Sequence, residues 1–338
     1  MTSREQAVRA HAPDGAPEIA AGTDLADVLL ALLPTDGLTG GLADGLQDGD
    51  VVVVTSKVVS KAEDRVVLGT RDEHLAAETQ RVVARRGPTT IVRTRHGLVL
   101  AAGGIDSSNV VQGSSVLLPL DPDASARRLR AALHRRTGLR LGVIITDTAG
   151  RAWREGQTDI AIGAAGVVVA ESFAGRHDAH GNELAVTAPA VADEIAGLAE
   201  LAQGKLGARP FAIVRGRDDL VLPVDDDGPG ASALVRVEGQ DLFGYGAREA
   251  VLRAVRGEAS DRAPFGAPVT ADDLVHAFAE TLEVEAVTTA PDCVQASVEG
   301  AGAAARAAVL AFAHGWQVDA DPGPTADDTA LRLRPCSP

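Results

Sequence analysis

The chain has 338 residues, of which 45% are hydrophobic and 23% charged, a composition typical of a folded protein long enough for two domains. Its formal net charge of −15 and its aromatic content of 3% argue against nucleic acid as a partner, because a polyanion would be repelled and would find few rings for base stacking. Two cysteines exclude a disulfide framework, and no stretch reaches the roughly 18 apolar residues of a membrane span. We therefore expect a cytoplasmic protein with no membrane partner.

The first predicted elements are a short strand, a helix and a buried strand. The short strand is expected near Val8–Ala12, and the helix follows Thr23 or Asp24, both good N-cap residues. The run Val51–Val54 has no polar face, which predicts a strand that is buried on both sides. This pattern favours an α/β domain.

Hydroxyls and lysines follow this strand in the segment TSKVVSK. In an extended segment Lys57, Val59 and Lys61 would share one face, because alternate side chains of a strand point the same way. Two lysines with no acid between them indicate either a bound anion or a solvated edge strand that ends in charges. The residues alone leave both interpretations open.

A second polar cluster is expected after another strand. Residues 72–87 are predicted to form a surface helix, and two strands follow, the second at Leu98–Ala102. That strand runs into GGIDSSNV, where Asp106 and Asn109 flank two serines. An Asx turn explains such a cluster, but its position at a strand end also favours a functional site.

The most informative stretch runs from Gly142 to Gly166. Its β-branched run Val143–Ile145 predicts a buried strand, and a carboxylate between two hydroxyls, Thr146–Thr148, stands where we expect that strand to end. Arg151 and Arg154 follow and are suited to holding oxyanions. The pattern indicates a metal and phosphate site, with a capped and salt-bridged turn as the alternative.

The rest of the chain predicts helices at Asp123–Gly138 and Ala190–Gly204, and a buried strand at Phe211–Val214. Residues 257–268 have the composition of a linker. We therefore predict a catalytic domain over residues 1–256, this linker, and a small α+β unit of unknown role over residues 269–338.

Four segments occur in an order that resembles the coenzyme F-420-0:L-glutamate ligase family, also called the F-420 gamma-glutamyl ligases. They are TSKVVSK, GGIDSSNV, TDTAGRAWREGQTD and the run GNEL…ADEI…QGKLGARPFAIVRG, within residues 8–246. The resemblance implies the family's mixed α/β (α+β) fold, a homodimer, and GTP-dependent addition of L-glutamate to F-420-0 or its dehydro form, with gamma linkages after the first. Relatives with a second domain bind FMN, but the roughly 90 residues after Arg248 are too few for that domain, so no FMN is expected.

Matching the family's motifs implies the site residues. Two divalent ions, Mg²⁺ or Mn²⁺, would be held by Asp106, Asp147, Thr148 and Gln203, with K⁺ as a candidate further ion. The implied nucleotide-binding residues are Ala16, Pro17, Glu18, Ile19, Ser56, Lys61, Asn109, Gly204 and Lys205. The implied catalytic residues are Asp106, Asp147 and Lys61. The chain departs from the family at Ala16, where a leucine is usual.

The expected chemistry agrees with these residue types. A carboxylate joins an amine at neutral pH only after activation, most simply as an acyl phosphate made from the γ-phosphate of GTP. Divalent ions and the lysine would neutralise the charge that develops during phosphoryl transfer. The alternatives are a metal-dependent phosphohydrolase or phosphotransferase, which would need no glutamate, and a non-catalytic nucleotide-binding protein.

Overall fold

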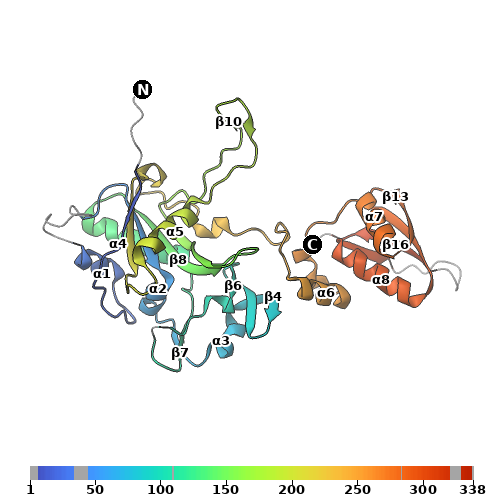
Figure 1. Ribbon diagram of the computed structural model, residues 1–338, viewed down its shortest axis with the longest axis horizontal. Coiled ribbons are helices and arrows are strands. Elements are labelled where there is room, and N and C mark those ends of the chain that lie inside the picture. The colour runs from blue at the N-terminus through green and yellow to red at the C-terminus, as the bar shows by residue number, and fades with distance from the viewer. Residues whose placement is uncertain (1–6, 34–44, 109, 283, 320–328, 337–338) are drawn as a thin grey trace. The chain divides into compact units, whose positions relative to one another are not determined.

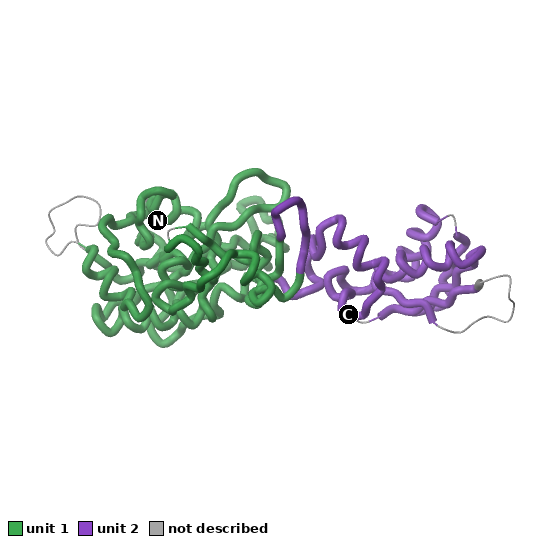
Figure 2. Tube along the Cα trace, turned by 90° about the horizontal axis from the view of Figure 1, so that it is seen from below, with its two compact units in different colours: residues 1–81, 91–235 green, residues 82–90, 236–338 purple. Residues whose placement is uncertain are grey.

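The computed structural model describes residues 7–33, 45–108, 110–282, 284–319 and 329–336 (Figure 1). The chain divides into two compact units (Figure 2). Unit 1 comprises residues 1–81 and 91–235, and unit 2 comprises residues 82–90 and 236–338. Among the described residues, the two units have separate hydrophobic cores.

Unit 1 is built on a five-stranded mixed sheet. The strands lie in the order β1 (Arg9–His11), β12 (Phe211–Arg215), β2 (Val51–Thr55), β8 (Gly142–Gly150) and β9 (Gln157–Ala165). Only β2 and β8 are parallel, and the other neighbours are antiparallel. This arrangement confirms the predicted mixed α/β fold class.

Helices cover both faces of this sheet, as the apolar composition of its central strands requires (Figure 1). On one face, α1 (Leu25–Leu32) and α4 (Pro122–Thr137) contribute to a core that contains Val52 and Val54. On the other face, α5 (Val191–Gln203) contributes to a second core with the intervening valines of β2. Alternate valines of one strand therefore enter different cores, which explains why the strand has no polar side.

Two local predictions near the polar segments are wrong. Ser56–Ala62 is helix α2 rather than an extended segment, so Lys57 and Lys61 share a face because they are four residues apart on a helix. Strand β8 does not end at Thr146. It continues to Gly150 because its polar half pairs with β9.

The predicted surface helix over residues 72–87 is also wrong in its second half. Helix α3 spans only Arg71–Glu78, and β4 follows at Thr79–Arg86, where β-branched Thr79, Val82 and Val83 favour a strand. Strand β4 belongs to a three-stranded sheet in the order β4, β5 (Thr89–Thr94) and β6 (Val99–Ala101). Two small two-stranded sheets pair β3 (Val66–Leu68) with β7 (Ser114–Val116), and β10 (Arg176–His177) with β11 (Glu183–Leu184).

Unit 2 contains α6 (Ala247–Arg256) and a small α+β fold. Two successive helix–strand–strand segments form an antiparallel sheet in the order β13 (Glu285–Ala290), β14 (Cys293–Val298), β16 (Thr329–Pro335) and β15 (Trp316–Asp319). The helices of these segments are α7 (Ala271–Leu282) and α8 (Gly300–Ala313). The α+β character of the C-terminal part is confirmed, whereas the domain limits at residues 256 and 268 remain a prediction.

A buried arginine, Arg130, connects α4 to the loop of residues 222–227. Arg130 is 4% exposed, and its guanidinium donates hydrogen bonds to the carbonyls of Leu141 and of residues 222, 223, 224 and 226, and to the carboxylate of Asp227. Gly166 passes beside this group with a φ of 68°, and a Cβ there would lie 2.0 Å from Nε of Arg130. The backbone at residue 166 therefore requires glycine for two separate reasons.

We expect Gly166→Ala to lower the free energy of unfolding much more than Gly138→Ala. Gly138 also has a positive φ, 73°, but nothing lies within 4 Å of a Cβ there, so its variant measures the backbone cost alone, about 1–2 kcal/mol. Gly166→Ala adds the displacement of a guanidinium that is held by several hydrogen bonds, about 2 kcal/mol or more. Urea denaturation of both variants measures the difference, and equal losses would contradict the anchoring role of Arg130.

Candidate active site

The parallel register of β2 and β8 brings two distant segments together. Thr55 pairs with Thr146, so the next residues along the two strands, Ser56 and Asp147, are neighbours at the same edge of the sheet. The Ser56 hydroxyl, at the start of α2, donates a hydrogen bond of 3.0 Å to Oδ1 of Asp147, 91 residues away in sequence. Two of the predicted site residues are therefore in direct contact.

The carboxyl group of Asp147 is in an environment that disfavours its charge. Burial raises the pKa of Asp147 to about 7, even though hydrogen bonds from Ser56 and from the Thr148 backbone favour the ionised form. The negative charges of Asp159 and Asp106 raise it further. A cation placed beside Asp147 would relieve both effects.

Asp106 is held in its ionised form by an ammonium group. Its Oδ2 lies 2.5 Å from Nζ of Lys57, and its two oxygens also accept hydrogen bonds from the backbone N–H and the hydroxyl of Ser108. Burial alone would raise the pKa of Asp106, but the hydrogen bonds from Lys57 and Ser108 hold it below the ordinary value. The Asx turn expected in GGIDSSNV is therefore present, and the same carboxylate also makes the ion pair with Lys57.

Thr148 connects β8 to the end of α5. Its hydroxyl donates to Oδ1 of Asp159 at 2.8 Å and accepts from Nζ of Lys205 at 3.1 Å. Asp159 is 4% exposed on the neighbouring strand β9. Burial, followed by the charge of Asp159, also raises the pKa of Glu200 on α5, which Lys205 partly offsets. Glu200 was not among the predicted residues, and no motif in the sequence points to it.

Lys61 is paired with the N-terminal segment. Its Nζ lies 2.5 Å from Oε1 of Glu18, and its side chain is 8% exposed, whereas that of Glu18 is 82% exposed. The two predicted nucleotide-binding segments, APEI (residues 16–19) and α2, are therefore adjacent, with Ile19 buried beneath. Lys57 and Lys61 thus each pair with a different carboxylate from another segment of the chain.

Gln203 is buried at the last position of α5, 2% exposed, next to Gly204. Neither polar atom of its carboxamide makes a hydrogen bond within the described part of the chain. The hydroxyl of Thr146, directly before Asp147, is also buried without a partner there. Leaving such groups unpaired costs about 1–3 kcal/mol each, so each of these two side chains could accept a further polar partner.

The donor set suits a hard divalent cation. Within the described residues no group of three or more His, Cys, Asp or Glu side chains is arranged around a metal position, so a metal would depend on few carboxylates. Asp106, Asp147, Thr148 and Gln203 offer carboxylate, hydroxyl and carboxamide oxygens, which are the ligand types that Mg²⁺ and Mn²⁺ prefer. The raised pKa of Asp147 and the unpaired Gln203 make these residues compatible with an ion.

Two other predicted residues are not part of the contacts described above. Arg151 is exposed and donates to the carbonyl of Glu155 in its own turn. Asn109, one of the predicted nucleotide-binding residues, lies outside the described residues. Sequence reasoning missed the role of Lys57 as partner of Asp106, because nothing local in the chain indicates that long-range pair.

The sequence matches the family described as F420-0:gamma-glutamyl ligase over residues 15–71 and 73–216. These ranges contain every predicted site residue, and residues 217–338 lie outside them. The chain belongs to this family, which confirms the resemblance inferred from the four motifs.

Named relatives agree with the family match. The chain is 38% identical to the coenzyme F420:L-glutamate ligase of Archaeoglobus fulgidus over 224 residues, which cover 60% of this chain and 85% of that protein. The protein of the same name from Methanopyrus kandleri is 37% identical over 235 residues, 62% of this chain and 92% of the relative. The protein of the same name from Methanothermobacter thermautotrophicus is 34% identical over 224 residues, which cover 60% of this chain and 86% of that relative. The prediction that the chain is a ligase enzyme of this kind is confirmed.

One further property can be reported for the described residues. None of their helices has both the length and the apolar character needed to cross a membrane.

We expect Asp147→Asn to stabilise the metal-free protein at pH 8. The folded-state pKa of Asp147, about 7, lies above its ordinary value of 3.8, so the stability from this group is complete below about pH 4 and is lost as the pH rises through 7. The neutral asparagine avoids a cost on the order of 4 kcal/mol at pH 8.

Thermal unfolding in chelator-treated buffer between pH 5 and pH 8 measures this effect. The gain of the variant over the unaltered protein should grow with pH, whereas Asp292→Asn, at an exposed turn position, should change nothing. A gain that is independent of pH would contradict the raised pKa of Asp147. Added Mn²⁺ should stabilise only proteins that retain Asp147.

Proposed function

We propose that the protein ligates L-glutamate to coenzyme F420-0, or to its dehydro form, at the expense of GTP, forming one amide bond and then gamma-linked glutamates. The proposal is supported most strongly by one observation: the Ser56–Asp147 contact unites two family motifs at the edge of the sheet, within the matched part of the chain. The relatives' names identify them as coenzyme F420:L-glutamate ligases. We further propose that the enzyme acts in the cytoplasm as a homodimer.

The proposed reaction has two steps. An oxygen of the F420-0 carboxylate attacks the γ-phosphorus of GTP, and the bond to GDP breaks, giving an acyl phosphate. The glutamate amine then attacks the acyl carbon, phosphate leaves, and the nitrogen loses a proton. Both steps bring anions together, so catalysis depends on positioning and on fixed positive charge.

The residues of this chain would divide that work between them. Lys61, which is buried and fixed by Glu18, is the proposed cation for the nucleotide phosphates. Asp106, Asp147, Thr148 and Gln203 are the proposed ligands of two divalent ions, which when bound would neutralise phosphate charge and orient the γ-phosphoryl group. The hydrogen bond from Lys205 to the Thr148 hydroxyl places the turn that contains Gly204 next to Thr148.

The function is tested by incubating the purified protein with GTP, Mn²⁺ or Mg²⁺, L-glutamate and F420-0. Mass spectrometry should detect products heavier by one or more glutamyl units, with GDP and phosphate formed in equal amounts. Hydrolysis of GTP without dependence on glutamate would instead support a phosphohydrolase. Intact GTP and no heavier product would eliminate both activities.

We expect Asp147→Asn to reduce metal-dependent glutamyl transfer by at least about 100-fold, because a neutral carboxamide is a much poorer ligand for a divalent ion. Circular dichroism should show an unchanged fold. Asp178→Asn, in the exposed β10–β11 hairpin, is the matched control and should keep full activity. Activity of the Asp147 variant equal to that of the control would remove Asp147 from the proposed ligand set.

The predicted domain division is tested by truncating the chain after residue 258. Described residues between Ala271 and Leu333 form a core of their own, which shares no residue with the cores that hold β2 and β8. We therefore expect the shortened protein to remain soluble and to keep glutamyl transfer within about threefold of the full chain. Aggregation, or loss of activity in a soluble fragment, would show that the C-terminal unit is required for the catalytic part.

A further inference from the structure

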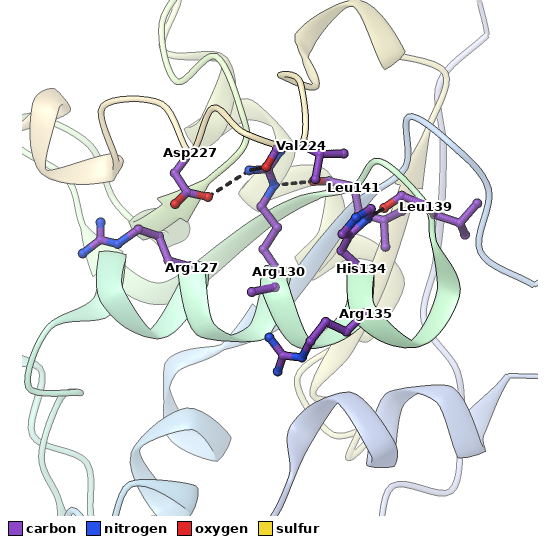
Figure 3. Close-up of a pocket in the computed structure, with 9 residues that line it drawn as sticks. Arg127, Arg130, His134, Arg135, Leu139, Leu141, Val224 and Asp227 are labelled. Atoms are coloured by element: carbon purple, nitrogen blue, oxygen red, sulfur yellow. Dashed lines mark hydrogen bonds and ion pairs between the residues drawn. The ribbon is translucent and has the colours of Figure 1, made fainter.

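A second charged site lies in unit 1, apart from the residues of the candidate active site. A cavity of about 220 Å³ is bounded by α4 and by the loop of residues 222–227 (Figure 3). Four basic side chains of α4 line it: Arg127, Arg130, His134 and Arg135. Their spacing places them along one side of the helix, because residues three, four, seven or eight apart share a face.

The positive charge in this cavity is only partly compensated. Arg130 forms an ion pair of 2.8 Å with Asp227, the one carboxylate of the lining. A guanidinium nitrogen of Arg127 is 3.9 Å from a carboxylate oxygen of Asp121, and the side chain of Arg135 makes no hydrogen bond or ion pair with any described residue. Three guanidinium groups thus face one carboxylate, in a chain whose net charge is −15. Such a local excess of arginine is the composition of an oxyanion site.

The cavity is also rigid at its base. Arg130 is fixed by its bonds to the loop carbonyls, and the hydrogen bond of 2.9 Å between Nδ1 of His134 and the carbonyl of Leu139 orients the imidazole ring. The apolar residues Ala131, Leu139, Leu141 and Val224 complete the lining. A pre-formed site of this kind pays little ordering entropy when a ligand binds.

We propose that this cavity binds a phosphate group, either as inorganic phosphate or as a small phosphomonoester. Guanidinium groups match phosphate oxygens in bidentate geometry, and the volume is below the roughly 300–1,000 Å³ of sites for drug-sized ligands. Leu141 precedes β8, and Asp147 is six residues further along, about 20 Å at the rise of a strand. The site is therefore separate from the candidate active site, and the proposal does not depend on the proposed function.

The test is calorimetric titration of the full-length protein, free of metal and nucleotide, with inorganic phosphate and separately with glycerol 3-phosphate. We expect saturable binding of one ligand per chain, and the tighter of the two identifies the source of the phosphate group. Arg127→Ala combined with Arg135→Ala should weaken binding at least tenfold. The single variant Arg135→Gln should also weaken binding, but by less than the double variant. Both side chains are exposed on α4, so the variants should fold normally, which near-ultraviolet circular dichroism checks.

Two controls make the result specific. Arg136→Ala removes the same charge from the adjacent position, where the arginine pairs with Asp24 and Asp27 outside the cavity, and should change affinity less than threefold. Lys61→Ala should leave binding intact, because Lys61 belongs to the other site. Absence of saturable binding below about 10 mM, equal losses in the control, or dependence on Lys61 would each overturn the proposal.

Discussion

The parallel pairing of β2 with β8 is the constraint on which the candidate active site depends. Five residue pairs in register, from Val51 with Gly142 to Thr55 with Thr146, fix the point at which α2 begins beside Asp147. A shift of one residue in this pairing would place each valine of β2 in the opposite core. It would also separate Ser56 from the carboxylate of Asp147. The two cores therefore enforce the register, and the register positions the chemistry.

Electrostatics at this edge of the sheet are balanced by long-range pairs. Lys57 forms an ion pair with Asp106, and Lys61 forms one with Glu18, so both lysines of α2 are paired with carboxylates from other segments. Asp147 has only neutral donors beside it and therefore carries the electrostatic cost, visible as its raised pKa. An environment that penalises the negative charge of Asp147 is suited to a cation, which would supply the positive charge that the neighbouring donors lack.

Much of this arrangement could be predicted from sequence, and the failures have physical causes. The valine run of β2 and the isoleucines of β8 predicted buried strands because burial on both faces leaves no polar alternation. Helix α2 was missed because its two β-branched valines favour a strand locally, whereas packing against the sheet favours a helix. Strand β8 was predicted too short because its polar residues gain partners only when β9 folds back beside it.

The site residues, too, could be predicted only in part from the sequence. Asp106 and Asp147 could be found from their positions after apolar runs and from the family motifs, whereas Glu18–Lys61 and Lys57–Asp106 arise only from tertiary contacts.

The central claim is that Asp147 and Asp106 share a metal-dependent site. Anomalous diffraction from crystals grown with Mn²⁺ and a non-hydrolysable GTP analogue tests it most directly. Our account predicts manganese in contact with a carboxylate oxygen of Asp147 and the analogue's γ-phosphate beside Lys61. Manganese bound elsewhere, with Asp147 still bonded only to Ser56 and the Thr148 backbone, would contradict it.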